Sequence, residues 1–196
     1  MKYHTALRKE SNSDKGVLEG VYKGKGLTIF QHSILGSVPR EFFAADVVYS
    51  EVAWQAGYKK FTENSLASDS DFRSYIRAVE SVIFALGVPS YIIAGKQMQK
   101  SMNPQVIHPL KFAVHKNIDV LLLAYNTSEK PPVETEAECI EWIAAQYKCV
   151  LDFCCGYSER LISAIKRNSK QAILTDINRG CLLEVIEKHN LEKEEQ

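Results

Sequence analysis

The chain has no apolar run near the roughly 20 residues that a membrane-spanning helix requires, so the sequence predicts no membrane span. It also has no basic excess: 24 Lys and Arg residues balance 24 Asp and Glu residues, and the formal net charge is zero. Dedicated nucleic-acid-binding proteins usually carry a basic excess. The balance therefore argues against a protein that binds DNA unaided. The polar start, Met1 to Glu10, has no signal-peptide apolar region, and we expect a cytoplasmic protein.

The cysteines form no CxxC pair, and their number is odd. Cys154 and Cys155 are adjacent, and neighbouring side chains on a strand point to opposite faces, so these two would not share one metal ion. The sequence also has no P-loop and no Ser-His-Asp pattern. We therefore predict no metal site, and we expect all five cysteines to be reduced, mostly buried thiols: Cys139, Cys149, Cys154, Cys155 and Cys181.

What the sequence does contain is an alternation of buried-type strands with helical patterns. This alternation predicts a three-layer α/β fold with a mostly parallel sheet. The expected strands cover residues 27–30, 45–51, 88–94, 148–155 and 172–177. The expected helices cover residues 71–86, 135–146, 159–167 and 181–189, and the second of these is acidic in its first turn, as the helix dipole favours.

The remaining segments complete the expected architecture. Residues 111–115 and 118–125 are expected to form a β-hairpin that turns at Lys116-Asn117. Residues 1–20 are polar and are expected to form a flexible arm, whereas residues 190–196 form a charged tail. The sequence contains no repeat or linker, so we expect residues 1–196 to form one domain.

The most informative stretch is 150–159, where a strand ending at Asp152 enters a tight turn at Gly156 and then a helix. The turn amides and the helix N-terminus favour an anion, while Asp152 favours an ammonium group. Asp176 ends the next strand, where an acid commonly binds ribose hydroxyls. A dinucleotide site would require GxGxxG, so the pattern indicates a cofactor without phosphates, such as S-adenosylmethionine. The alternative is an ordinary strand–turn–helix crossover with a structural aspartate.

This stretch resembles the cofactor motif D-P-F-C-G-S-G of the permuted (β-order) DNA amino-methyltransferases. In that class a Lys-Pro pair precedes the motif and a strand ending G-I-D-I-N follows it; this chain has Lys130-Pro131, then 150–156, then 174–178. Phe153 stands for the motif proline, and Tyr157-Ser158 stand for Ser-Gly. The resemblance implies a permuted, Rossmann-like methyltransferase fold that binds S-adenosylmethionine. The cofactor-binding residues that it implies are Lys130, Pro131, Asp152, Phe153, Cys154, Gly156, Asp176 and Ile177.

In the same family the catalytic strand comes early and ends in D-P-P-W or D-P-P-Y. The corresponding residues here are Glu51, Val52, Ala53 and Trp54. By resemblance, Glu51 and a backbone carbonyl would accept the hydrogens of an amine, and Trp54 would stack on a base flipped out of the duplex. Glu51 extends about one bond further than aspartate, and a displacement of ~1 Å can cost roughly 100-fold in rate.

Three functions remain open at this stage. The first is methylation of an amino group, adenine N6 in DNA in preference to RNA. The second is a catalytically silent subunit of the same fold that binds nucleic acid or a partner protein, and the third is methylation of a small molecule or free nucleotide. The segment between Trp54 and Asp71 is too short for a target-recognition domain. We therefore expect little intrinsic sequence specificity, or specificity supplied by a homo- or hetero-oligomer.

Overall fold

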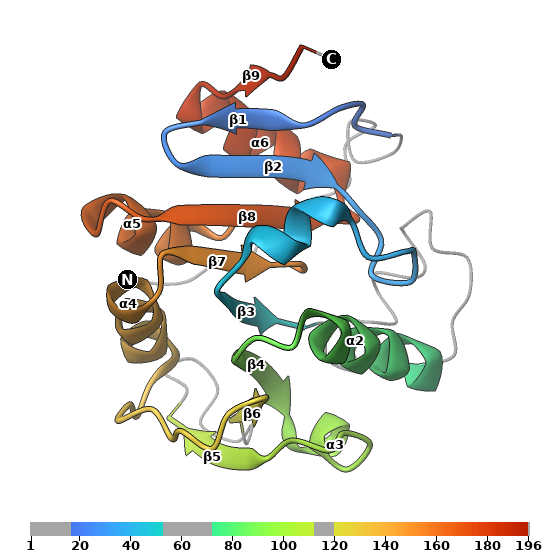
Figure 1. Ribbon diagram of the computed structural model, residues 1–196, viewed down its shortest axis with the longest axis vertical. Helices are drawn as coiled ribbons and strands as arrows, with labels where there is room; N and C mark the ends of the chain where they lie inside the picture. Colours follow the sequence, from blue (N-terminus) through green and yellow to red (C-terminus); the bar gives the residue numbers. More distant parts are fainter. Residues whose placement is uncertain (1–16, 53–71, 112–119, 196) are drawn as a thin grey trace.

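A nine-stranded mixed sheet forms the centre of the protein (Figure 1). The computed structural model describes residues 17–52, 72–111 and 120–195. The strand order is β5-β6-β4-β3-β7-β8-β2-β1-β9, and the five strands β4, β3, β7, β8 and β2 are parallel to one another. The strands are β1 (Tyr22–Gly24), β2 (Leu27–Gln31), β3 (Val47–Glu51), β4 (Ser90–Gly95), β5 (Val106–Leu110), β6 (Val120–Tyr125), β7 (Cys149–Asp152), β8 (Gln171–Asp176) and β9 (Glu192–Lys193).

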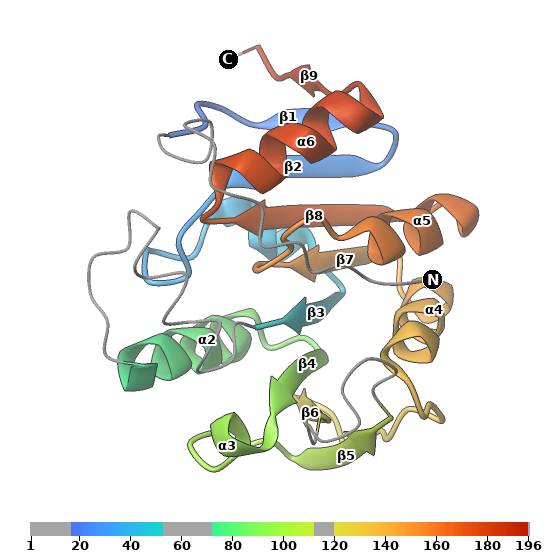
Figure 2. The ribbon, with the colours of Figure 1, turned by 180° about the vertical axis from the view of Figure 1, so that it is seen from behind.

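Helices cover both faces of this sheet, so the fold has the three layers that the sequence predicts. One face packs against the 3-10 helix η2 and the helices α2 and α3, which lie in front of the sheet in Figure 1. The other face packs against α4, α5 and α6, which lie in front in Figure 2. The helices are η2 (Arg40–Ala44), α2 (Phe72–Leu86), α3 (Lys96–Gln99), α4 (Glu136–Gln146), α5 (Glu159–Arg167) and α6 (Arg179–His189).

Local sequence explains the elements that matter for the site. All four residues of β7 are buried, as expected for a central parallel strand covered on both faces. The start of α4 is fixed by a capping box: the Thr135 hydroxyl accepts a hydrogen bond from the Glu138 amide (3.2 Å), and the Glu138 carboxylate accepts one from the Thr135 amide (3.1 Å). This box holds the first turn of α4 in a defined place.

The sequence did not reveal the edge strand of the sheet. The strand that pairs with β6 is β5, formed by residues 106–110, whereas the expected strand at 111–115 lies, apart from Lys111, outside the described residues. Pro109 lies inside β5, which is an edge strand, where a proline is tolerated because its missing N–H leaves no neighbouring strand unpaired. Lys111 instead forms a single bridge with Thr135. The expected turn at Lys116-Asn117 lies outside the described residues.

Both ends of the described chain extend the sheet beyond the expected elements. Leu18, within the segment expected to be an arm, is buried in the core, and β1 pairs with β2. Two residues of the expected charged tail form β9, which pairs with β1. Both residues of β9 are exposed, so the apolar alternation that marks a strand is missing there. Among the described residues, no helix has the length and apolar character needed to cross a bilayer.

Candidate functional site

Three neighbouring parallel strands each end in a carboxylate at the same edge of the sheet. Glu51 ends β3, Asp152 ends β7, and Asp176 ends β8. Because β7 pairs with β3 on one side and β8 on the other, these three ends lie next to one another (Figure 1). Ligands of parallel sheets bind beyond the carboxyl ends of the strands. We call the following group the carboxyl-edge site: Glu51, Asp152, Gly156, Ser158 and Asp176.

Asp152 is buried and is held by three donors. Its Oδ1 accepts hydrogen bonds from the Ser50 hydroxyl (2.7 Å) and the Cys154 amide (3.2 Å), and its Oδ2 accepts one from the Ser158 hydroxyl (2.8 Å). Burial raises the pKa of Asp152 to about 7, and the charge of Asp176 adds to this, although the three hydrogen bonds act in the opposite direction. The carboxyl group is therefore partly protonated near neutral pH.

The turn after β7 wraps around the second buried carboxylate. Oδ2 of Asp176 accepts a hydrogen bond from the Gly156 amide (2.8 Å), and Oδ1 accepts one from the Asn178 amide (2.7 Å). The Cys155 amide adds a bond to the Thr175 carbonyl (3.0 Å). Burial raises the pKa of Asp176, whereas the backbone amide bonds lower it. The turn and the end of β8 are thus joined into one unit.

Glycine is required at the centre of this turn. Gly156 has a φ of +50°, a conformation that residues with a side chain rarely adopt. A Cβ added at this position would meet no atom within 4 Å, so the space beside the turn is open. An open cradle of backbone next to a strand end is the arrangement expected of a cofactor-binding turn.

Ser158 stands where the resembling family has glycine, and its backbone has a left-handed conformation that glycine adopts freely. Its φ is 41° and its ψ is 28°. A short polar side chain tolerates this region better when it forms local hydrogen bonds, as the Ser158 hydroxyl does with Asp152. Serine at this position therefore has a glycine-like backbone conformation and adds a hydrogen-bond donor to Asp152.

Glu51 lies at the rim, with its side chain reaching solvent. Partial loss of hydration around the carboxylate raises the pKa of Glu51 to about 7. The negative charges of Glu136 and Asp152 act in the same direction. Arg160 opposes them. Near neutral pH the Glu51 side chain is therefore close to equally divided between its protonated and ionised forms.

The other predicted site residues occupy different environments. Phe153 is almost fully buried in the core on the α2 side, and the half-buried Cys154 has its Sγ 3.6 Å from the Tyr75 hydroxyl. Ile177 is half-buried, and its carbonyl accepts a hydrogen bond from Gln31 (2.7 Å). Cys154 is half-buried and the other four cysteines are buried; all five lie in the described part of the chain, and none forms a disulfide.

The Lys-Pro pair precedes α4. Lys130 is exposed and Pro131 is buried in the segment that runs beside β5 towards that helix. The helix itself reaches the carboxyl-edge site through Glu136, whereas a cofactor contact by Lys130 or Pro131 stays a prediction. Trp54, the predicted stacking residue, lies outside the described residues. Glu51, three residues before it, lies on the same edge as Gly156.

Four features of the site were not predicted from the sequence: the roles of Ser50, Glu136 and Arg160, and the hydrogen bond from Ser158 to Asp152. A signal existed for Ser50, a hydroxyl in a strand that is otherwise apolar, and for Glu136, an acid in the first turn of a helix. The first-turn acid was explained by the helix dipole. Its contact with β3 joins residues 87 positions apart and could not be seen in a local pattern.

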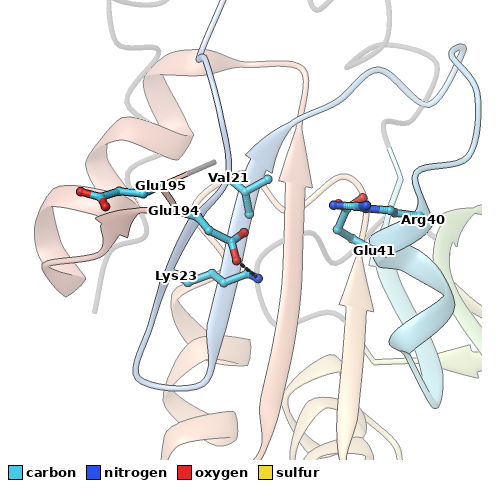
Figure 3. A pocket seen from close by; sticks show the side chains of 6 residues that line it. All are labelled: Val21, Lys23, Arg40, Glu41, Glu194 and Glu195. Carbon is cyan, nitrogen blue, oxygen red and sulfur yellow. Dashed lines mark hydrogen bonds and ion pairs between the residues drawn. The ribbon is translucent and has the colours of Figure 1, made fainter.

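A separate hollow of about 700 Å³ lies between β1, the residues after β9 and η2 (Figure 3). Lys23 and Glu194 form an ion pair on one side of it (2.7 Å), and Arg40 pairs with Glu41 on the other (3.1 Å). None of its lining residues belongs to the carboxyl-edge site. Ion pairs near the surface of this kind contribute little to stability.

The comparisons with known proteins agree with this fold. No protein-family model matches the chain, and no curated protein matches it in sequence. The crystal structure of M1.HpyAVI matches with a TM-score of 0.52 at 10% identity, over 83% of this chain and 98% of that chain. The M1.HpyAVI–SAM complex gives 0.49 at 10% identity over 83% and 99% of the two chains. TTHA0409 from Thermus thermophilus, assigned provisionally as a DNA modification methylase, gives 0.47 at 13% identity over 82% and 93%. The chain therefore shares the fold of M1.HpyAVI, an α/β fold with a mixed sheet between two helical layers, as its sequence predicts.

Proposed function

We propose that this protein is an S-adenosylmethionine-dependent methyltransferase that acts on an amino group, adenine N6 in DNA. The observation that carries the proposal is the pairing of β3 with β7, which brings the strand end that carries Glu51 next to the strand end that carries Asp152. In the chain, the strand that ends in Glu51 precedes the strand that ends in Asp152. This order supports the permuted class that the motifs resemble.

The residues present fit the cofactor. Asp176 would hold the ribose hydroxyls, and the Gly156 turn, with Asp152, would hold the methionine part. The two carboxylate oxygens have four lone pairs, and the amides of Gly156, Asn178 and Ile177 occupy three of them, so Asp176 can accept one further hydrogen bond from a ribose hydroxyl. The sulfonium of S-adenosylmethionine supplies an electrophilic methyl group. Its positive charge is complementary to an edge that carries Glu51, Asp152 and Asp176.

Glu51 would act on the acceptor. In its ionised form the carboxylate accepts a hydrogen from the exocyclic amine and so orients the nitrogen lone pair for in-line attack. The protonated form is a weaker hydrogen-bond acceptor and carries no negative charge to balance the charge that develops on the amine, so a pKa of about 7 makes the step sensitive to pH. Trp54, which follows β3 closely in sequence, would provide the stacking surface for a base flipped out of the duplex.

The second candidate is a silent subunit of the same fold that binds nucleic acid or a partner protein. Two observations favour it. Val52, which stands where the resembling family has proline, is buried in the core. Asp152 already has three protein donors that would compete with the ammonium group of the cofactor. Under either candidate, a partner subunit or a second copy would supply sequence specificity.

The test is transfer of a labelled methyl group from S-adenosylmethionine to duplex DNA, single-stranded DNA, RNA or free nucleotides, alongside calorimetry with the cofactor. Label in DNA that is lost in Glu51→Gln, but kept in the exposed control Glu187→Gln, supports the enzyme. Cofactor binding without transfer to any acceptor supports the silent subunit. If calorimetry detects no cofactor binding, the proposed enzyme fails, and only a silent subunit without cofactor remains.

A further inference from the structure

The side chain of Glu51 lies on the α4 and α5 face of the sheet. Side chains two positions apart on a strand point to the same face. Tyr49 belongs to the hydrophobic cluster that includes α4 and α5, so Glu51, two residues later on β3, points towards the same helices. The residues that face Glu51 from these helices therefore bear on what its carboxylate can do.

Glu136 reaches this place from the first turn of α4, with both of its carboxylate oxygens engaged. The Tyr49 hydroxyl donates to Oε1 (3.3 Å), and the guanidinium of Arg160 on α5 donates to Oε2 (3.4 Å). The Glu136 side chain is only 16% exposed, because the strand and α5 enclose it. The capping box at Thr135 fixes the turn that carries it. Glu136 is thus a fixed negative charge rather than a mobile surface acid.

We propose that Glu136, fixed by Tyr49 and Arg160 on the face of the sheet to which Glu51 points, controls the charge of the Glu51 carboxylate. The catalytic meaning of this control rests on the function proposed above for Glu51. The physical interaction does not, and it can be measured in a protein that transfers no methyl group.

The charged groups around Glu51 act with opposite signs. Glu136 on α4 and Asp152 on β7 raise its pKa beyond the effect of burial, whereas Arg160 on α5 lowers it. Removing the charge of Glu136 should therefore favour the ionised form of Glu51, and removing the charge of Arg160 should favour the protonated form. A general loosening of the edge would admit water and lower the pKa in both variants.

The chain contains a matched control. Arg167 and Glu141 form a second ion pair between α5 and α4, further along the same two helices and exposed on both sides. If the Arg160–Glu136 pair only joined the helices, the two pairs would be equivalent. Only the Arg160–Glu136 pair contacts the strand that carries Glu51, through Tyr49.

The experiment is an NMR titration of the Glu51 carboxyl carbon in protein labelled with ¹³C-glutamate, with the signal assigned by its loss in Glu51→Gln. We expect Glu136→Gln to lower the pKa of Glu51 by about 1, and Arg160→Gln to raise it. Arg160→Lys, which keeps the charge, should restore a value near that of the unchanged protein. Glu141→Gln and Arg167→Gln should leave it in place.

Two results would overturn the inference: no change in Glu136→Gln, or a downward change in both Glu136→Gln and Arg160→Gln. The proposed function fails separately. Opposite changes in a protein that transfers no methyl group would retain the Glu136 interaction and refute the enzyme. An active enzyme whose Glu51 titration ignores Glu136 would retain the function and refute the interaction.

Discussion

The Ser158 hydroxyl donates a 2.8 Å hydrogen bond to Oδ2 of Asp152, while the Ser158 backbone has a φ of 41°. Ser158, which stands where the resembling family has glycine, thus has a left-handed backbone and donates a hydrogen bond to the carboxylate at the end of β7. The bond explains how a left-handed serine is tolerated at the N-terminus of α5, where it forms no side-chain cap. It also means that the turn and Asp152 cannot be altered independently.

A pair of serine-to-glycine variants separates the two roles of Ser158. Ser169, in the connection after α5, is also left-handed, with a φ of 53°. Ser169→Gly should raise the free energy of unfolding by roughly 0.5 to 1 kcal/mol, because the left-handed penalty disappears. Ser158→Gly should instead lower it by about 1 kcal/mol, because it also loses a bond to a buried carboxylate. Urea unfolding measures both; equal stabilisation would show that the Ser158 hydroxyl bond is not formed.

Gly156 and Gly87 provide a second matched pair. Both have positive φ, and a Cβ added to either would meet no atom within 4 Å. Gly156→Ala and Gly87→Ala should each lower the free energy of unfolding by about 1–2 kcal/mol. Only Gly156→Ala should weaken binding of S-adenosylmethionine, by roughly tenfold, because its methyl group points into the space proposed for the cofactor. Calorimetry decides: equal affinities in the two variants would remove the cofactor from this turn.

The fold was largely predictable because its strongest signals are local. Apolar strands of 4 to 6 residues followed by amphipathic helices gave the parallel core correctly. The elements that the sequence did not reveal lie where local pattern and tertiary context disagree. A proline such as Pro109 disfavours a strand, yet the edge of the sheet tolerates it in β5, and the exposed residues of β9 carry no apolar alternation.

Of the candidate site, the sequence predicted only the residues that lie at strand ends. Glu51, Asp152 and Asp176 each end a strand, so the rule for parallel sheets places them together. Their partners could not be derived, because Ser50 and Asp152 are 102 residues apart and Tyr49 and Glu136 are 87 apart. Such pairs depend on the register between β3, β7 and α4, which no single stretch of sequence encodes.

The pKa of Asp152 links the site to stability. Burial raises it from 3.8 to about 7 in the folded protein, so the folded state binds this proton more tightly than the unfolded chain does. The resulting stabilisation is fully present below about pH 4 and is lost as the pH rises through 7. Burial raises the pKa of Asp176 in the same direction. We therefore expect the free energy of unfolding to fall between about pH 5 and pH 8.

Asp152→Asn isolates this contribution. Asparagine has nearly the same shape and can keep bonds to Ser50 and Ser158, but it does not titrate. Urea unfolding at several pH values should show a shallower fall than in the unchanged protein, with Asp176 supplying the remainder. An unchanged slope would show that Asp152 is ionised throughout this range.

The pH dependence of methyl transfer tests the role of Glu51. The ionised carboxylate is the stronger acceptor for the amine hydrogens, and the pKa of Glu51 is raised to about 7, first by partial loss of hydration at this rim position and then by Glu136 and Asp152. The turnover rate at saturating cofactor should therefore rise with pH and reach half of its plateau near pH 7. Glu51→Gln should abolish the rise together with most of the activity, whereas the exposed control Glu187→Gln should keep both.

Asp152 titrates in the same range, so Asp152→Asn must be measured as well. If the rise survives in Asp152→Asn, Glu51 is its source; if it disappears there while persisting in Glu51→Gln, the pH-sensitive group is the cofactor-side aspartate, and the proposed role of Glu51 is wrong.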